Sequence, residues 1–153
     1  MTTSITNTGY EALSAGILAA FFAQVIKFFI FTIKAKKVNF KIFTTTGGMP
    51  SSHSAGTVAL ATTVGIICGF LSVEFAIAIG FAIIVMYDAA GLRRAAGKTA
   101  ACLNKMMEEF YTGKLTDPQE KLKELLGHTP FEVFVGAILG AVLAFVNHYI
   151  MFQ

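Results

Sequence analysis

Charged side chains and long polar stretches are scarce in this sequence. Of its 153 residues, 14% are Asp, Glu, Lys or Arg and 55% are hydrophobic. No low-complexity tract or internal repeat interrupts the apolar character of the chain. This composition excludes an ordinary soluble domain, and we expect an integral membrane protein.

Patterns that bind metals, nucleotides or nucleic acids are also missing. The two cysteines, Cys68 and Cys102, lack the spacing of a disulfide pair or a metal site, which predicts reduced structural thiols. Walker-type glycine loops, zinc spacings and calcium loops do not occur, so we expect no cofactor and no metal. The net charge of +3 comes without a base-reading module, so we expect no nucleic-acid partner.

Long apolar segments predict an all-α membrane bundle. A segment near each end of the chain exceeds the roughly 20 residues that cross a bilayer. The apolar stretch 53–90 is too long for one span and suits two. The first segment lacks the basic start and cleavage site of a signal peptide, which indicates a permanent span. We therefore expect one membrane domain, 1–153, with four transmembrane helices at about 10–33, 53–71, 74–90 and 130–152.

The basic residues predict the orientation of the chain. All twelve Lys and Arg residues lie in or after the first predicted span, or after the third. The positive-inside rule then places the loops 34–52 and 91–129 in the cytoplasm and both termini outside. We expect a bacterial cytoplasmic membrane as the location and membrane lipids as partners. Gly136 and Gly140 on the last span would permit close helix contacts, either within one chain or between the two chains of a homodimer.

The second loop predicts two short cytoplasmic helices. Residues from Ala95 to about Thr112 have apolar and charged residues on different faces, which indicates an amphipathic helix at the inner interface or over the site. Residues 116–127 carry a capping pattern and a stop at Gly127, which predicts a second helix. We expect both helices to serve as scaffolding.

The segment Gly47–Ala55 predicts a helix start that can bind an anion. Pro50 suits the first turn of a helix, and Ser51 or Ser52 can cap the free amide groups there. Such a start presents N–H donors and a positive dipole end. His53 lies where it could exchange a proton with the anion. The alternative is a tight polar turn between membrane helices.

A second helix start carries a histidine and a carboxylate. Pro130 marks the start, so His128 stands at the cytoplasmic end of the last span, with Glu132 one turn along. A carboxylate that holds one imidazole nitrogen leaves the other nitrogen free as a nucleophile or base. An ionisable residue at this depth is a functional candidate. The alternative is an interfacial glutamate that only caps the helix.

Basic side chains on the same face could neutralise a phosphate. The guanidinium groups of Arg93 and Arg94 suit phosphate, although topology alone would also place them after the third span. Lys27 lies about two turns inside the first span and either snorkels or points into a polar pocket. Asp88 most simply pairs with one of the two arginines. Together these residue types suit phosphoryl transfer without a metal.

The segments 47–55, 86–93 and 126–133 resemble the divergent branch of the type-2 phosphatidic acid phosphatase superfamily, related to acid phosphatase and vanadium-dependent haloperoxidase. The residues Pro-Ser-Ser-His at 50–53 are similar to the Pro-Ser-Gly-His signature, which implies that His53 is the general acid. By the same resemblance, His128 is the nucleophile and Glu132 its orienting partner.

Other parts of the superfamily signatures are replaced or missing. Lys27 is the candidate for the first signature's lysine, without the arginine-proline that should follow it. The Ser-Arg of the third signature is absent before His128, and Arg93 could substitute for it.

The resemblance implies a membrane phosphatase that cleaves an amphiphilic substrate, such as a lipid or isoprenoid phosphate, through a phosphohistidine. The alternative is a non-catalytic lipid-phosphate carrier or assembly protein that uses the same pocket. The predicted site comprises His128, His53 and Glu132 as catalytic residues, Lys27, Arg93, Ser51, Ser52 and Gly48 as phosphate-binding residues, and Asp88, Arg94 and Lys41 as supporting residues.

Overall fold

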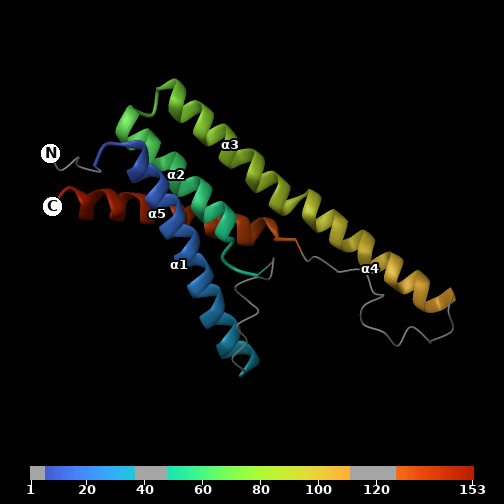
Figure 1. The fold of residues 1–153 in the computed structure, drawn as a ribbon. Coiled ribbons are helices and arrows are strands. Elements are labelled where there is room, and N and C mark those ends of the chain that lie inside the picture. Colours follow the sequence, from blue (N-terminus) through green and yellow to red (C-terminus); the bar gives the residue numbers. More distant parts are fainter. Residues whose placement is uncertain (1–5, 37–47, 111–126) are drawn as a thin grey trace.

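All regular structure in the described part of the chain is helical, as the sequence predicts. The computed structural model describes residues 6–36, 48–110 and 127–153 (Figure 1). The predicted helix at 116–127 and Lys41 therefore lie outside the described residues, apart from Gly127. The five helices are α1 (Gly9–Ala35), α2 (Ser52–Cys68), α3 (Val73–Ala90), α4 (Leu92–Phe110) and α5 (Pro130–Met151).

Helix lengths and composition suit a membrane. Three helical runs, α1, α5 and the nearly continuous α3–α4 run, are long and apolar enough to cross a bilayer, and α2 is apolar but has 17 residues. At 1.5 Å per residue α2 spans about 26 Å, slightly less than the roughly 30 Å hydrocarbon core. Helix α4 follows α3 almost directly, after Gly91, and extends away from the bundle (Figure 1).

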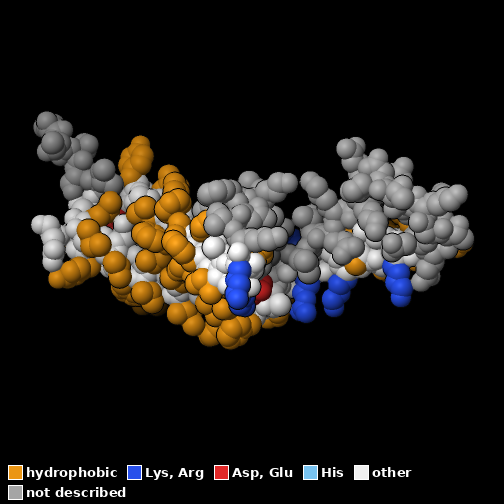
Figure 2. Space-filling view, turned by 90° about the horizontal axis from the view of Figure 1, so that it is seen from below, with side chains coloured by type: hydrophobic (Ala, Val, Ile, Leu, Met, Phe, Trp, Pro, Cys, Tyr) orange, Lys and Arg blue, Asp and Glu red, His pale blue; other side chains and the backbone are white. Residues whose placement is uncertain are grey.

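Helix α2 is the centre of the bundle. It packs against α1, α3 and α5, whereas among the described helices α4 contacts α3 alone. Small side chains make these contacts. The fully buried core residues between α1, α2 and α5 are all alanines. Large apolar side chains point outward instead, and they cover the visible face of the bundle in Figure 2. An apolar exterior of this kind is expected where the surrounding solvent is lipid.

Close backbone contacts hold α2 between its neighbours. A β-carbon at Gly140 of α5 would overlap the carbonyl oxygen of Ala55 in α2. Gly16 of α1 and Gly56 of α2 approach each other in the same way, since a β-carbon on either would lie 3.0–3.1 Å from the other's carbonyl oxygen. The small-residue spacing on the last span therefore serves contacts within the chain.

Hydroxyl caps define where the apolar helices begin. The Ser51 side chain accepts the amide of Ser54 at the start of α2, and Ser72 does the same for α3. Thr129 and Glu132 form a complete capping box on α5. The prediction that Pro50 lies in the first turn of α2 is wrong: Ser51 is the N-cap, so Pro50 precedes the helix.

The start of α1 and the end of α5 are joined by a contact between a buried glutamate and a histidine. Glu11, at the start of α1, is fully buried, and its Oε1 lies 2.6 Å from Nδ1 of His148 near the end of α5. Its other oxygen accepts the amide of Asn7 at 2.7 Å. The pair holds α1 against α5, because removing His148 would leave Oε1 of the fully buried Glu11 without this partner.

We expect Gly140→Ala to destabilise the fold, because the new methyl group overlaps the backbone of α2. Overpacking of this kind costs about 1–3 kcal/mol, which should lower the midpoint of thermal unfolding in detergent micelles. The matched control is Gly80→Ala in α3, where a β-carbon would meet nothing within 4 Å. If both variants unfolded at the same temperature, the proposed close contact between α2 and α5 would be wrong.

Candidate functional site

Two capped helix starts lie side by side in this bundle. The amide of Ser51, the N-cap of α2, donates to the carbonyl oxygen of Glu132 in the first turn of α5 at 3.2 Å. The Ser51 hydroxyl in turn accepts a hydrogen bond from the Ser54 hydroxyl at 3.0 Å. The positive dipole ends of α2 and α5 are thereby held at one place, which favours an anion there.

His128 is fixed from both its backbone and its ring. Its amide donates to the carbonyl oxygen of Ala89 at 3.1 Å, which ties it to the end of α3. Its Nδ1 lies 3.2 Å from Oε2 of Glu132, and its side chain is only 4% exposed. If Nδ1 carries the proton and donates to the carboxylate, the lone pair of Nε2 is left for chemistry.

Glu132 combines the two roles that the sequence left as alternatives. The same Oε2 atom that contacts His128 also accepts the amide of Thr129 at 3.1 Å, which closes the capping box. The capping bonds hold the carboxylate in place, so the helix cap orients the imidazole. A carboxylate in this position can stabilise an imidazolium and fix the ring.

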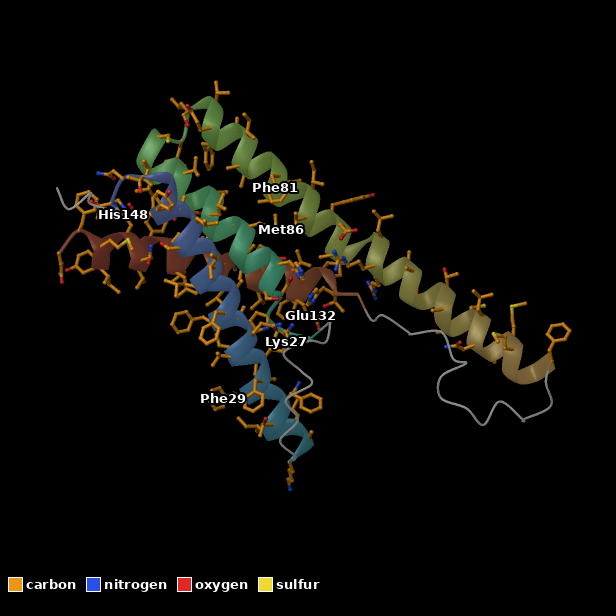
Figure 3. All side chains as sticks on the ribbon, viewed as in Figure 1. Lys27, Phe29, Phe81, Met86, Glu132 and His148 are labelled. Atoms are coloured by element: carbon orange, nitrogen blue, oxygen red, sulfur yellow. The ribbon has the colours of Figure 1, made fainter. Side chains whose placement is uncertain are left out.

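Lys27 points into the polar cluster rather than out to the bilayer surface. Its side chain is 5% exposed and lies within electrostatic reach of Glu132. Figure 3 shows Lys27 and Glu132 next to each other where α1 passes the start of α5. A β-carbon at Gly48 would lie 3.6 Å from Cδ of Lys27, so this glycine, at φ +84°, borders the lysine stem.

His53 and Arg93 complete the cluster at its open side. His53, in the first turn of α2, is exposed and lies within electrostatic reach of Lys27, Arg93 and His128. Nε of Arg93 bonds Oδ2 of Asp88 at 2.7 Å, so the carboxylate orients the guanidinium. Two histidines, two carboxylates and two cations of the predicted site are thus brought together.

The other predicted residues differ in how they relate to this cluster. Ser51 and Ser52 are buried at the start of α2, where Ser51 is the cap. The Arg94 residue is exposed. Its backbone lies against Gly127, since a β-carbon on Gly127 would overlap the backbone nitrogen of Arg94. No contact in the described residues brings the Arg94 side chain into the cluster. That part of the chain also shows no group of three or more His, Cys, Asp or Glu residues arranged to hold a metal ion.

The surroundings of His128 favour its neutral form. Burial lowers the pKa of the His128 imidazole, and the positive charges of Lys27 and His53 act in the same direction. The hydrogen bond and the charge of Glu132 raise the pKa and oppose these effects. Since the net direction is downward, His128 is neutral at neutral pH, which is the state that a nucleophile or base requires.

Sequence reasoning missed two structural supports of the site. The Ala89 carbonyl that anchors His128 carries no side-chain signal, so no motif could have indicated it. The pairing of Glu11 with His148 has no local signal, because each of the two apolar spans contains several polar residues that could find a partner. It lies at the opposite end of α5 from Glu132 (Figure 3) and supports the bundle rather than the cluster.

The chain is similar to known proteins over nearly all of its length. A family model described as the divergent PAP2 family matches residues 8–143, a range that contains every candidate site residue. The uncharacterized membrane protein YuiD of Bacillus subtilis (strain 168) is 43% identical over 152 residues, which cover 93% of this chain and 96% of that protein. No solved structure matches.

We expect substitutions in the cluster to move the pKa of His128 in opposite directions. Glu132→Gln removes the charge that stabilises the imidazolium, so the pKa of His128 should fall further. Lys27→Met removes a nearby positive charge, so the pKa should rise. The measurement is an NMR titration of the ring signals of His128, which is one of three histidines in the chain.

The matched control is Lys34→Met, because Lys34 is also on α1 but is exposed in its last turn. This substitution should leave the titration unchanged. An identical His128 titration in the wild type and in both Lys27→Met and Glu132→Gln would contradict the convergence of these groups.

Proposed function

The chain belongs to the divergent PAP2 family, and from that membership and the geometry of its site we propose that it is a membrane phosphatase. In this proposal it releases inorganic phosphate from an amphiphilic phosphate monoester, such as a lipid or isoprenoid phosphate. His128 is the nucleophile, Glu132 its positioning residue and His53 the general acid. Lys27, Arg93 and the amides at the start of α2 bind the phosphate oxygens.

The observation that carries this proposal is the buried His128 with Nδ1 held by Glu132 beside a buried cation. A purely structural role for His128 would leave the burial of Lys27 near it unexplained, because burying a lysine costs free energy. The desolvated lysine gains from a bound anion, and the neutral imidazole is competent to attack one. The two helix starts add donors for the oxygens of the phosphate.

The proposed reaction has two steps. Nε2 of His128 attacks phosphorus, the phosphorus–oxygen ester bond breaks, and protonated His53 gives its proton to the leaving alkoxide. A water molecule then attacks the phosphohistidine, neutral His53 takes its proton, and the phosphorus–nitrogen bond breaks. Inorganic phosphate leaves, and both histidines return to their starting states.

The proposed placement in the membrane has four spans, α1, α2, α3 and α5, with the site at the cytoplasmic end. The basic residues support this orientation, because positive charge follows α1 and α3 and is absent from the turn between α2 and α3. The structure is consistent with it: both termini lie at one end of the bundle, where Glu11 meets His148 (Figures 1 and 3). The cluster at the starts of α2 and α5 is at the other end.

We expect the purified protein to release phosphate from medium-chain alkyl phosphates and to be inhibited by vanadate, which mimics the trigonal-bipyramidal transition state. Acid-stable phosphoserine should be absent, and an acid-labile, base-stable phosphoenzyme should be trapped from labelled substrate. His128→Gln should abolish this phosphoenzyme, and Glu132→Gln should lower the rate about 100-fold or more.

The matched control for the glutamate is Glu74→Gln, an exposed residue at the start of α3 and the opposite end of the bundle. It should leave the rate unchanged. Tight binding of intact alkyl phosphate without release, and with no effect of His53→Ala or His128→Gln on binding, would support a carrier and overturn the phosphatase.

We expect the orientation to be measurable with an impermeant thiol reagent. Leu71 lies in the turn between α2 and α3 and is fully exposed. In a chain with Cys68→Ser and Cys102→Ser, Leu71→Cys should therefore be labelled in intact cells. Lys98→Cys on α4 should be labelled only after the membrane is permeabilised. The reverse pattern would place the site outside the cell.

A further inference from the structure

An apolar groove runs between α1 and α2 and ends at the candidate site. Its volume is about 520 Å³. Its walls include Leu13, Ile17 and Phe21 of α1 and Leu60 of α2. At one end it is bordered by Ser52 and His53, so it joins the cluster.

The register of the two helices gives the groove a direction. Gly16 of α1 lies against Leu60 and Gly56 of α2, and Ala20 lies against Gly56. Since the helices are antiparallel, Leu13 is at the end far from the site, and Gln24 is at the end near His53. The floor is the close glycine contact, and among the described residues no lysine, arginine or carboxylate lines the walls.

The groove opens toward the surface that faces lipid in the proposed membrane placement. Ile17 and Phe21 line it and are largely exposed. A molecule could therefore enter sideways from the bilayer without crossing water. Leu13 and Gln24 are eleven positions apart on α1, which corresponds to about 16 Å along the helix.

We propose that this groove binds the apolar chain of the phosphate monoester while its phosphate lies at His53 and Lys27. The inference rests on the proposed function for the identity of the anionic end. It is supported by the match between a ligand with one anionic end and a site with one cationic end and uncharged walls. Because an extended chain zigzags, each carbon–carbon bond advances about 1.25 Å, so twelve carbons span about 14 Å and fit within about 16 Å, whereas sixteen carbons span about 19 Å and exceed it.

The test compares single-chain alkyl phosphates of four, eight, twelve and sixteen carbons. For the wild type, kcat/KM should rise with chain length up to about twelve carbons and then level off. Ile17→Trp fills the groove from its exposed rim and should remove most of this rise, about tenfold for the twelve-carbon substrate, with the four-carbon substrate unaffected. Phe21→Ala removes a wall and should also reduce the preference for long chains.

The matched control is Phe81→Ala. Phe81 on α3 is 55% exposed, close to the 59% of Phe21, and does not line the groove (Figure 3). It should keep the chain-length profile of the wild type. Retained profiles in both Ile17→Trp and Phe21→Ala would overturn the groove proposal while leaving the phosphatase proposal intact.

A second measurement separates the two proposals without turnover. A twelve-carbon alkylphosphonate with a terminal diazirine cannot be hydrolysed and should label residues near Leu13 or Leu60 on irradiation, and the twelve-carbon phosphate should compete with it. Such labelling in a protein that hydrolyses nothing would support the groove and overturn the phosphatase. Equal labelling by an alkyl diazirine without the phosphonate would indicate a structural lipid and would overturn the groove proposal.

Discussion

The hydrogen bond from the Ser51 amide to the Glu132 carbonyl is the interaction on which the site depends. It joins the first turns of two helices that are about eighty residues apart in sequence. Close contact between α2 and α5 makes the bond possible, because glycine at 136 and 140 lets the backbones meet. Without that contact, Ser51 and the pair of His128 and Glu132 would not lie next to each other.

Buried charge is the second constraint on this bundle. In an apolar environment an isolated ammonium or carboxylate is costly, and it persists where partners or a ligand compensate it. Glu11 has its partner in His148 and an amide from Asn7, which explains its full burial in structural terms. Lys27 and Glu132 lie within reach of each other, and Arg93 is paired with Asp88, so the cluster holds two cations and two carboxylates. A bound phosphate would interact with the two cations and with the positive ends of α2 and α5.

The sequence predicts much of this arrangement because helix starts and membrane spans have local signals. The caps at Ser51 and Thr129 follow from residue type and spacing, and so does the approach of Glu132 to His128 one turn away. The fold class follows from the apolar runs. The local signals do not place Pro50 correctly. Its position relative to the helix depends on which residue is the N-cap, and Ser51 takes that role because its side chain accepts the Ser54 amide.

Other features depend on contacts that no local pattern encodes. The sequence allows the Lys27 side chain either to snorkel to the bilayer surface or to be buried. It is buried because α1 crosses the start of α5 at this residue. The same holds for the choice of Arg93 over Arg94 as the partner of Asp88. The pairing of Glu11 with His148 joins residues 137 positions apart, and the groove exists only because Gly16 meets Gly56. These are properties of helix packing, which the residue spacing alone leaves undetermined.

The central claim is that two helix starts, two histidines and a buried lysine form one anion site. An experimental structure of the protein with vanadate tests this most directly. The account predicts one vanadate with its vanadium bonded to Nε2 of His128, its oxygens within hydrogen-bond distance of Lys27 and the α2 amides, and His53 at the opposite apex. Vanadate bound away from His128, or a structure in which Lys27 points to lipid and His128 stands apart from His53, would contradict it.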